Sequence, residues 1–408
     1  MSTNCIRAMA TKQISANTCK AVRYPPVACT NALRTQAPNS FSVKHAPVNS
    51  PSGLSRQIYG KKSVKTSSRR LSSLGVVAST QESVVVADLG GTNARFQLWN
   101  VEIGGGEEVL VKEKIFPAAD FETFPEAFTA FIEATGYDGD IAAAAFAVAG
   151  PVADNRCQMT NISWVVDGSE LENTFDVKRV SVLNDFEAIG YGCTAVAEEN
   201  LLVLNDVPQR MESPAVCVGP GTGLGEALIV YDATNEEYKV LPSEGGHVGV
   251  SPRGEVQRAL VAYLEDTCGD AELEYVVSGS GLQRIYNFLR EYRGNTNAPE
   301  LEPAEVSQKG MAEECELCTE AVTIFLDILG YEASNFGLKA LAKGGVYIAG
   351  GIPPKMKSEI EKGGVLKAFL QEGTRFAPLR AQFPLYVVLD DKIGLLGTKV
   401  YALQSLRK

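Results

Sequence analysis

The stretch VVVADLGGTNARFQLW, residues 84–99, decides which fold the sequence predicts. An apolar run ends at Asp88, two glycines and Thr92 follow, and a second apolar run then begins. This order predicts two strands joined by a glycine turn, whose exposed backbone N–H groups suit a phosphate. A carboxylate beside such a site is explained if the phosphate brings a cation, because Mg²⁺ neutralises nucleotide phosphates and accepts one or two carboxylates. We therefore predict that Asp88 holds Mg²⁺; the alternative is a turn-forming Asp that bonds its own backbone.

The stretch VCVGPGTGLGEALIVYD, residues 216–232, repeats this plan of strand, glycine turn and strand. Two such units, each followed by helical patterns, predict an α/β fold of two similar lobes with a cleft between them. A dinucleotide-binding fold is disfavoured, because neither turn contains G-x-G-x-x-G and each leads into a strand instead of a helix. The apolar spacing also predicts helices over residues 186–199 and 310–342. The candidate phosphate-binding residues are Gly90, Gly91, Thr92 and Asn93 in the first turn, and Gly219, Gly221, Thr222, Gly223 and Gly225 in the second.

Charge divides the chain of 408 residues into two unlike parts. Residues 1–81 contain twelve Lys and Arg but no Asp or Glu, whereas the remainder carries 26 basic residues against all 49 acids. A long, basic, acid-free leader is typical of an organellar transit peptide. Its Ser, Thr and Pro content favours a plastid, and there the stroma, over a mitochondrion. The alternative is a disordered basic tail that binds nucleic acid, but the acidic remainder argues against such a partner. No apolar run reaches the roughly 18 residues that a membrane span needs.

Six cysteines are scattered through the acidic part, in no pattern of a secreted disulfide framework. Cys315 and Cys318 form a C-x-x-C, but no second Cys or His pair stands nearby to complete a zinc site. The acidic residues around them indicate a helix, on which two thiols three residues apart share one face. This favours a structural pair and leaves a redox role open.

The stretch VLNDFEAIG, residues 182–190, places Asn184 and Asp185 where a strand gives way to a helix. An amide beside an ionised carboxylate suits the binding of sugar hydroxyls. A carboxylate with an ordinary pKa of about 4 cannot deprotonate an alcohol in advance, but it can accept the proton late in a loose phosphoryl-transfer transition state. Helix capping is the alternative role of this pair, and the two roles are compatible.

Two further glycine-rich stretches are candidate binding loops. In PSEGGHVGVSP, residues 242–252, His247 is the only histidine outside the leader, and Glu244 precedes it by three residues. We expect this pair to bond sugar hydroxyls; a structural turn is the alternative. At the end of an apolar run, Gly350 and Gly351 would allow an adenine ring or a ribose to pack against the backbone.

Taken in order, the motifs of the chain resemble the bacterial-type glucokinase family of actin-like sugar kinases. They are DLGGTNAR (88–95), MTN (159–161), LNDF (183–186), GPGTGLG (219–225), EGGH (244–247), the E-x-x-x-SG of residues 274–279, GGVYIAGGI (344–352) and IGLLG (393–397). Together they span nearly all of residues 83–408. The related repressor–kinase group is disfavoured, because it carries a Cys-rich zinc motif downstream of the Glu-x-x-His segment, where this chain has only Cys268.

The resemblance implies a two-lobed, actin-like (ribonuclease H-like) α/β fold. After a leader over residues 1–81, a small domain would comprise residues 82–195 and 389–408, and a large domain residues 196–388. It implies glucose and ATP as substrates, Mg²⁺ as cofactor, phosphoryl transfer to the glucose 6-hydroxyl, and a homodimer. Asp185 matches the family's catalytic base. The residues that match its glucose contacts are Asn161, Asn184, Asp185, Glu244, His247 and Glu274, and those that match its ATP and Mg²⁺ region are Asp88, Gly90, Gly91, Thr92, Asn93, Gly219, Gly221, Thr222, Gly223, Gly225, Gly350 and Gly351.

Three other functions compete with this one: a sugar-binding sensor with weak or no turnover, a kinase for another hexose, and an actin-like scaffold. The presence of Asp88, Asn184 and Asp185 argues against a sensor, which could lose them. The pair of Glu244 and His247 argues against a scaffold.

Overall fold

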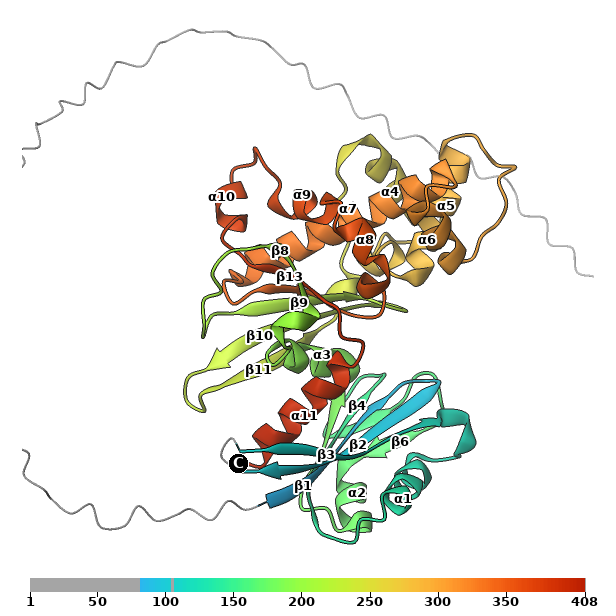
Figure 1. The fold of residues 1–408 in the computed structure, drawn as a ribbon. Helices are drawn as coiled ribbons and strands as arrows, with labels where there is room; N and C mark the ends of the chain where they lie inside the picture. The colour runs from blue at the N-terminus through green and yellow to red at the C-terminus, as the bar shows by residue number, and fades with distance from the viewer. Residues whose placement is uncertain (1–80, 104–105, 408) are drawn as a thin grey trace, which may run out of the picture. The chain divides into compact units, whose positions relative to one another are not determined.

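Two large β-sheets, one small hairpin and the helices packed on them make up the part of the chain that the computed structural model describes, residues 81–103 and 106–407 (Figure 1). The predicted leader lies outside these residues except for Gln81, which begins the first strand. The helices are α1 (Phe124–Thr135), α2 (Gly168–Phe175), α3 (Asp185–Cys193), α4 (Gly254–Cys268), α5 (Gly279–Tyr292), α6 (Pro303–Met311), α7 (Glu316–Ala340), α8 (Lys357–Ile360), α9 (Gly364–Leu370), α10 (Ala377–Arg380) and α11 (Ile393–Ser405). The short 3₁₀ segments are η1 (Ala118–Asp120), η2 (Glu198–Asn200), η3 (Gly245–His247), η4 (Leu273–Tyr275) and η5 (Pro353–Met356).

The first sheet has the strand order β3-β2-β1-β4-β7. Its first three strands form an antiparallel meander, and β4 and β7 run parallel to β1. Apolar residues from Val84 to Ala87 are all fully buried, because helices cover both faces of the sheet. One face packs on α1 and α2 around Phe96 and Phe128, and the other meets α11. The strands are β1 (Gln81–Leu89), β2 (Asn93–Glu102), β3 (Glu108–Pro117), β4 (Ile141–Val148) and β7 (Val180–Asn184), and a separate hairpin joins β5 (Arg156–Gln158) to β6 (Val165–Asp167).

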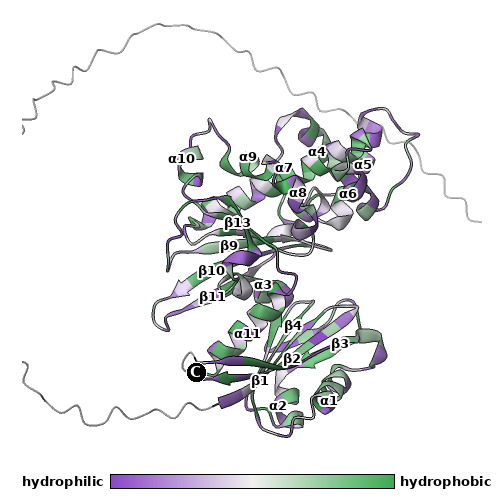
Figure 2. Ribbon diagram, viewed as in Figure 1, coloured by the Kyte–Doolittle hydropathy of each residue, from purple (hydrophilic) through white to green (hydrophobic). Residues whose placement is uncertain are grey.

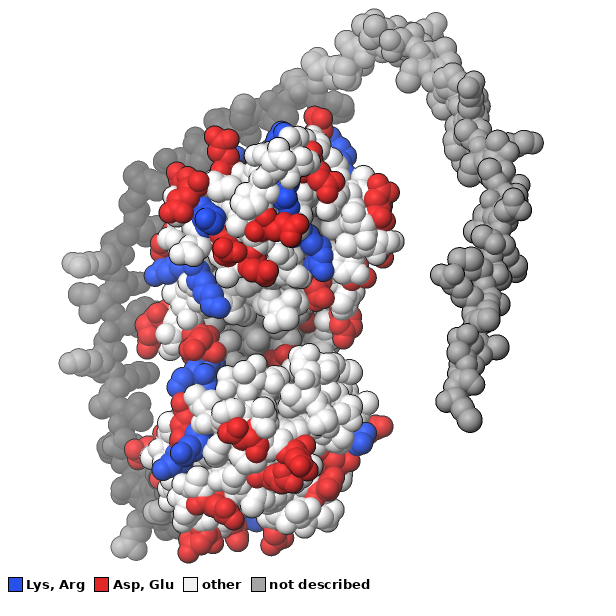
Figure 3. Space-filling model, turned by 90° about the vertical axis from the view of Figure 1, so that its right-hand side faces the viewer, with Lys and Arg blue, Asp and Glu red and all other residues white. Residues whose placement is uncertain are grey.

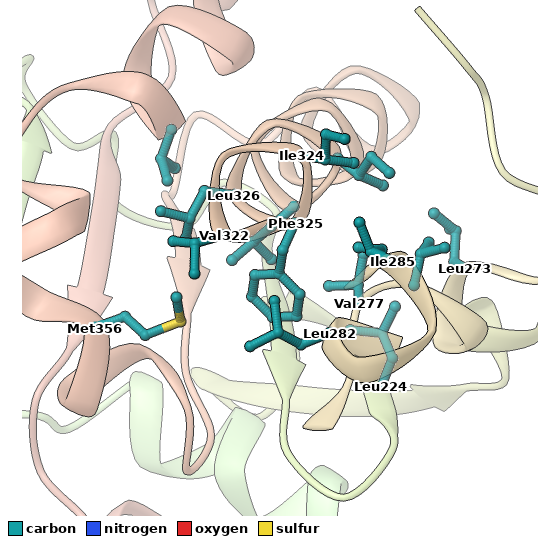
Figure 4. Close-up of a cluster of buried hydrophobic side chains, with 14 of the residues drawn as sticks. Leu224, Leu273, Val277, Leu282, Ile285, Val322, Ile324, Phe325, Leu326 and Met356 are labelled. Carbon is teal, nitrogen blue, oxygen red and sulfur yellow. The ribbon is translucent and has the colours of Figure 1, made fainter. Parts of the chain in front are cut away.

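The second sheet has the order β11-β10-β9-β12-β13-β8. The long helix α7 lies across it, and Phe325 of α7 packs with Leu282 of α5 and with Leu224 at the start of β10 (Figure 4). The core of this lobe therefore anchors the strand that leaves the second glycine turn. Apolar residues run along the inner strands of both sheets in Figure 2. The strands are β8 (Leu201–Asn205), β9 (Ala215–Pro220), β10 (Leu224–Asp232), β11 (Glu237–Ser243), β12 (Val346–Ile348) and β13 (Leu385–Val388).

A layer of two helices joins the lobes. Helix α3 packs on β9, β10 and β11, helix α11 packs on β1 and β4, and the two helices pack closely on each other (Figure 1). Their approach is backbone to backbone: a Cβ at Gly397 would overlap the carbonyl oxygen of Ala188, and one at Gly192 would overlap that of Ile393. The IGLLG motif thus supplies the glycine that lets the last helix contact the helix carrying Asp185.

The predicted two-lobed α/β arrangement is confirmed, whereas several element limits differ from expectation. The helix expected over residues 186–199 ends at Cys193. The helix expected over 310–342 begins only at Glu316, as α7, because a turn precedes it in which Glu313 adopts a left-handed φ of 57°. Residues 310 and 311 instead end a separate helix, α6. Strand β3 was not expected, because its residues are exposed on both sides and show no alternation of apolar and polar positions. The limits proposed for the small and large domains remain predictions.

The helix contact yields a stability prediction for Gly397→Ala. Alanine inside a helix is favoured over glycine by about 1 kcal/mol, but here the methyl group would enter the backbone of α3. Overpacking of this kind costs typically ~1–3 kcal/mol or more, so the variant should unfold at a lower urea concentration than the parent chain. Gly364→Ala is the matched control, because a Cβ there meets no atom within 4 Å. An unchanged urea midpoint for Gly397→Ala would contradict the close contact.

Candidate active site

A cavity of about 500 Å³ lies where the junction of β7 and α3, the β9–β10 turn and segment η3 meet. It brings together residues that are far apart in the sequence, from Pro151 to Gly351. Of the residues predicted for the site, those that line it are Asn184, Asp185, Gly219, Gly221, Thr222, Gly223, Gly225, Glu244, His247, Glu274, Gly350 and Gly351. Asp88, Gly90, Gly91, Thr92, Asn93 and Asn161 are not among the lining residues of this cavity.

Asn184 and Asp185 occupy different positions at the start of α3. Asn184 is the N-cap: its side-chain oxygen accepts hydrogen bonds from the backbone N–H groups of Phe186, at 2.9 Å, and Glu187, at 3.2 Å. Its amide nitrogen donates to the carbonyl oxygen of Gly150. Asp185 is the first residue of the helix, so its carboxylate faces the cavity without being needed as the cap.

The electrostatic setting of Asp185 differs from that of a carboxylate in water. Burial raises its pKa, while hydrogen bonds from the Phe186 backbone and from Asn184 oppose the rise. The backbone N–H of Phe186 lies 2.8 Å from Asp185 Oδ1. The expectation that Asp185 has an ordinary pKa is therefore wrong, because its pKa is raised. A raised pKa makes Asp185 a better proton acceptor.

Asp88 lies at the end of β1, close enough to Asp185 for the two carboxylates to repel. Burial, and then this repulsion, raise the pKa of Asp88 to about 6, and Arg95 works in the opposite direction. Arg95 pairs with Asp88 across the β1–β2 ladder. Beside this turn, a Cβ on Gly91 would come within 2.8 Å of Asn161 Cβ, so Asn161 lies against the first glycine turn. Asp88 thus links the first turn to the catalytic candidate Asp185.

Most glycines of the second turn are explained by side chains that pack against them. A Cβ on Gly219 or Gly225 would overlap the ring of Phe186, and one on Gly223 would overlap the carboxylate of Glu274. Only Gly221 of these four faces open space. None has a positive φ, so the turn needs glycine for close approach and not for a left-handed backbone.

Glu274, predicted to contact a sugar, also holds the second turn in place. Its Oε2 atom accepts a hydrogen bond of 2.9 Å from the backbone N–H of Leu224. The backbone N–H of Gly279 donates to the carbonyl oxygen of Gly221 at 3.0 Å. Segment η4 and the start of α5 therefore fix the turn from one side. Gly350 has a φ of 93° and packs on Pro220 at the start of this turn, while a Cβ on Gly351 would meet nothing within 4 Å.

His247 is held by a residue that the sequence did not single out. Its Nδ1 atom lies 2.8 Å from Glu272 Oε2, and its Nε2 atom lies 3.8 Å from Glu244 Oε2. The bond to Glu272 is the main cause that raises the pKa of His247. The side chain of Glu244 is 90% exposed, so Glu244 and the Nε2 edge of His247 are open to a ligand. Glu272 could have been suspected only because it lies two residues before Glu274.

Glu187, which lines the cavity, is another residue that the sequence did not single out. Burial raises the pKa of its carboxyl to about 7, against a backbone hydrogen bond from Asn184. Its place three residues after the Asn184 cap is the spacing of a capping box, which was the available signal. The other lining residues not anticipated are Pro151, Val152, Phe186, Ile189, Leu224, Pro242 and Ser243.

The described residues hold no group of three His, Cys, Asp or Glu that could bind a metal. Cys315 is the N-cap of α7 and Cys318 lies in its first turn, where burial and the neighbouring Cys315 raise the pKa of Cys318 to about 12.

No described helix is both long and apolar enough to cross a membrane. On the face drawn in Figure 3, acidic side chains are spread over both lobes with basic ones scattered among them.

Comparison with known proteins places this geometry in a family. A family model described as Glucokinase matches residues 85–405. The chain belongs to the glucokinase family. The glucokinase of Nostoc sp. is 34% identical over an alignment of 343 positions, which covers 78% of this chain and 98% of that protein.

Solved structures confirm the predicted two-lobed actin-like fold. The crystal structure of a glucokinase from an Antarctic psychrotroph is 31% identical, with a TM-score of 0.72, and the match covers 79% of this chain and 98% of that one. A ROK family glucokinase from Streptomyces griseus, solved in complex with glucose and AMPPNP, matches with a TM-score of 0.53 over 79% of this chain and 99% of that one. At 18% identity, this second structure is evidence for the fold alone.

The bond between His247 and Glu272 predicts the effect of Glu272→Gln. Loss of the carboxylate removes the main stabilisation of the charged imidazole, so the pKa of His247 should fall toward its ordinary value of 6.5. A proton NMR titration measures this directly, because the chain has only two histidines and His247→Gln assigns the signal. Glu244→Gln is the control and should shift the pKa less, since its carboxylate is more distant. A larger shift for Glu244→Gln would contradict this arrangement.

Proposed function

We propose that the protein is an ATP-dependent glucokinase that transfers the γ-phosphoryl group of ATP to the 6-hydroxyl of glucose, giving glucose 6-phosphate and ADP. The observation that carries the proposal is the cavity itself, which places Asp185 together with a glycine turn and with Glu244, His247 and Glu274. Membership of the glucokinase family supports the reaction class and the substrate.

On the sugar side, the cavity offers donors and acceptors of the kind that hexose hydroxyls require. Glu244 and Glu274 can accept hydrogen bonds, and His247 presents its Nε2 atom because Nδ1 is engaged by Glu272. Asn184 is less free for a ligand than the sequence implied, since it caps α3 and donates to Gly150. We infer that it acts chiefly by fixing the start of α3 beside the substrate.

Asp185 is proposed as the acceptor of the hydroxyl proton. The 6-oxygen of glucose would form a bond to the γ-phosphorus as the bond to the β–γ bridging oxygen breaks. ADP would leave with that electron pair, and the proton would pass late to the Asp185 carboxylate. Its position at the N-terminus of α3 favours the ionised form, while burial raises its pKa and with it the basicity.

The residues around Asp88 fit a Mg²⁺ ion that arrives with ATP. Two mutually repelling carboxylates, Asp88 and Asp185, create a need for positive charge that Arg95 meets only in part. Mg²⁺ keeps several of its waters and takes only one or two carboxylates from a protein. Asp88 would hold the hydrated ion, which neutralises charge on the β- and γ-phosphates. Gly221 and Thr222 would contact the phosphates, and Gly350 and Gly351 the adenosine.

A coupled assay with ATP and glucose tests the function. We expect turnover that disappears in EDTA and returns with Mg²⁺, and a preference for glucose over fructose, mannose and galactose. Binding of glucose without turnover would favour the sensor, turnover with another hexose a different kinase, and binding of neither substrate a scaffold. Light scattering on the same preparation tests the predicted homodimer.

The role of Asp185 predicts the kinetics of Asp185→Asn. Loss of a general base typically lowers the rate by about 10²–10⁴-fold, and the loss should fall on kcat because proton transfer belongs to the transition state. Folding should be unaffected, because Asn184 and not Asp185 caps the helix. The measurements are kcat, glucose affinity and melting temperature. A kcat within about threefold of the parent, well below the usual loss, would remove Asp185 as the base.

We also propose that residues 1–81 direct the protein to the plastid stroma. The proposal rests on the acid-free, basic composition of this segment. A fluorescent protein fused behind residue 81 should enter plastids and be recovered without the leader. Diffuse cytosolic fluorescence from an uncleaved fusion, or import into mitochondria, would contradict it.

A further inference from the structure

Glu226 lies beneath the loop that carries two of the proposed sugar contacts. It is the second residue after Leu224 on β10, it is 3% exposed, and it does not line the cavity. Its carboxyl packs against the main chain of Gly245: a Cβ on Gly245 would overlap Oε2 and lie 2.6 Å from Cδ. Gly245 directly follows Glu244 and precedes His247 by two residues, and both of these side chains belong to residues that line the cavity. A change in the position of the Glu226 carboxyl would therefore move the loop.

The loop rests on this part of β10 at more than one point. A Cβ on Gly246 would overlap the carbonyl oxygen of Leu224, so both glycines of the loop lie directly on the strand. The backbone N–H of Gly245 donates to Ser243 Oγ at 3.1 Å and leaves none for Glu226. The contact between Glu226 and Gly245 is therefore one of packing, and its geometry depends on where the carboxyl sits.

The surroundings of Glu226 do not accommodate a negative charge. Its Oε1 atom is buried and has no hydrogen-bond partner. The titratable groups that interact with it are Glu332 and Lys339 of α7 and, from β9, the thiol of Cys217, which burial keeps neutral. Glu332 is itself 4% exposed, and Lys339 lies 3.5 Å from Glu332 Oε1. Lys339 is thus engaged by the second carboxylate.

We propose that Glu226 is a positioning residue for the sugar-binding loop, residues 244–247, and that it holds the loop only as the neutral acid. Ionisation would leave a charged, unpartnered oxygen in a buried site, which is costly, and the carboxylate would move away from Gly245. The loop would then lose its support, and glucose would bind more weakly. The effect on glucose binding rests on the proposed function, whereas the support of the loop by neutral Glu226 does not.

The direction of the pH dependence follows from the raised pKa. Burial, and then Glu332, raise the pKa of Glu226 to about 8, against the effect of Lys339. The neutral acid predominates at pH 7, and at pH 9 roughly one molecule in ten retains it. If the ionised form does not bind glucose, the apparent affinity falls in proportion to the competent fraction. The KM for glucose should therefore rise up to about tenfold between pH 7 and pH 9.

The test compares Glu226→Gln with the parent chain across this pH range. Glutamine keeps the shape and cannot ionise, so the alkaline rise in the glucose KM should disappear in the variant. Asp185, Glu187 and His247 also titrate, but they do so in both proteins, and the difference between the two profiles isolates Glu226. Asp327→Asn is the matched control, because Asp327 is another carboxyl on the same lobe whose pKa burial raises. An alkaline rise that persists in Glu226→Gln, or one that Asp327→Asn removes, would overturn the proposal.

A second readout does not need catalysis. Hydrogen exchange of residues 244–247, measured by mass spectrometry without sugar and corrected for the intrinsic effect of pH, should accelerate at pH 9 in the parent and not in Glu226→Gln. Equal acceleration in both proteins would also overturn the proposal. If the parent turned over no hexose while the exchange result held, the proposed substrate would fail and the positioning role of Glu226 would stand.

Discussion

The contact between α3 and α11 is the constraint on which the site depends. Side chains keep most packed helices about 8–10 Å apart, but here Gly192 and Gly397 allow the two backbones to touch. Helix α11 lies on the first sheet, and helix α3 lies on the second. The contact therefore sets how far Asp88, at the end of β1, lies from the second glycine turn between β9 and β10. The separation of Asp88 and Asp185 is fixed by the first sheet, because Asp185 directly follows β7. Because the helix contact is made by main chain, it has no rotamers through which to relax.

A second constraint lies in the large lobe, at the first residues of β10. Leu224 is buried in the core against α5 and α7, it donates its backbone N–H to Glu274, and its carbonyl supports Gly246. Glu226, two residues on, packs under Gly245. The glycine turn proposed for phosphate and the loop proposed for glucose are thus parts of one packed unit. A displacement of the glycine turn would therefore shift the loop, and the reverse, because both pack on the same residues of β10.

The sequence could predict this site as far as its motifs extend. Glycine turns, the Asn-Asp pair and the lone histidine are local patterns with a local chemical meaning, and the second turn, the pair and His247 meet at one cavity. Glu272 and Glu226 could not be found in this way, because their roles come from contacts with residues 25 and 19 positions away. The function of the glycines was also hidden: Gly219 and Gly225 accommodate the ring of Phe186, which no spacing rule indicates. In the fold, β3 was missed because an exposed edge strand carries no periodic signal.

The position of α11 has a consequence for how the protein is made. The first sheet is built from residues 81–184, yet one of its faces is covered by the last helix, Ile393–Ser405. Strands β1 and β4 leave the ribosome with Val84, Val86 and Ala145 uncovered, and residues 149–392 must still be synthesised before α11 can cover them. Contacts of such long sequence separation form slowly, and the exposed apolar face is prone to aggregation in the meantime. The N-terminal lobe therefore cannot complete its core until the last helix of the chain has been synthesised.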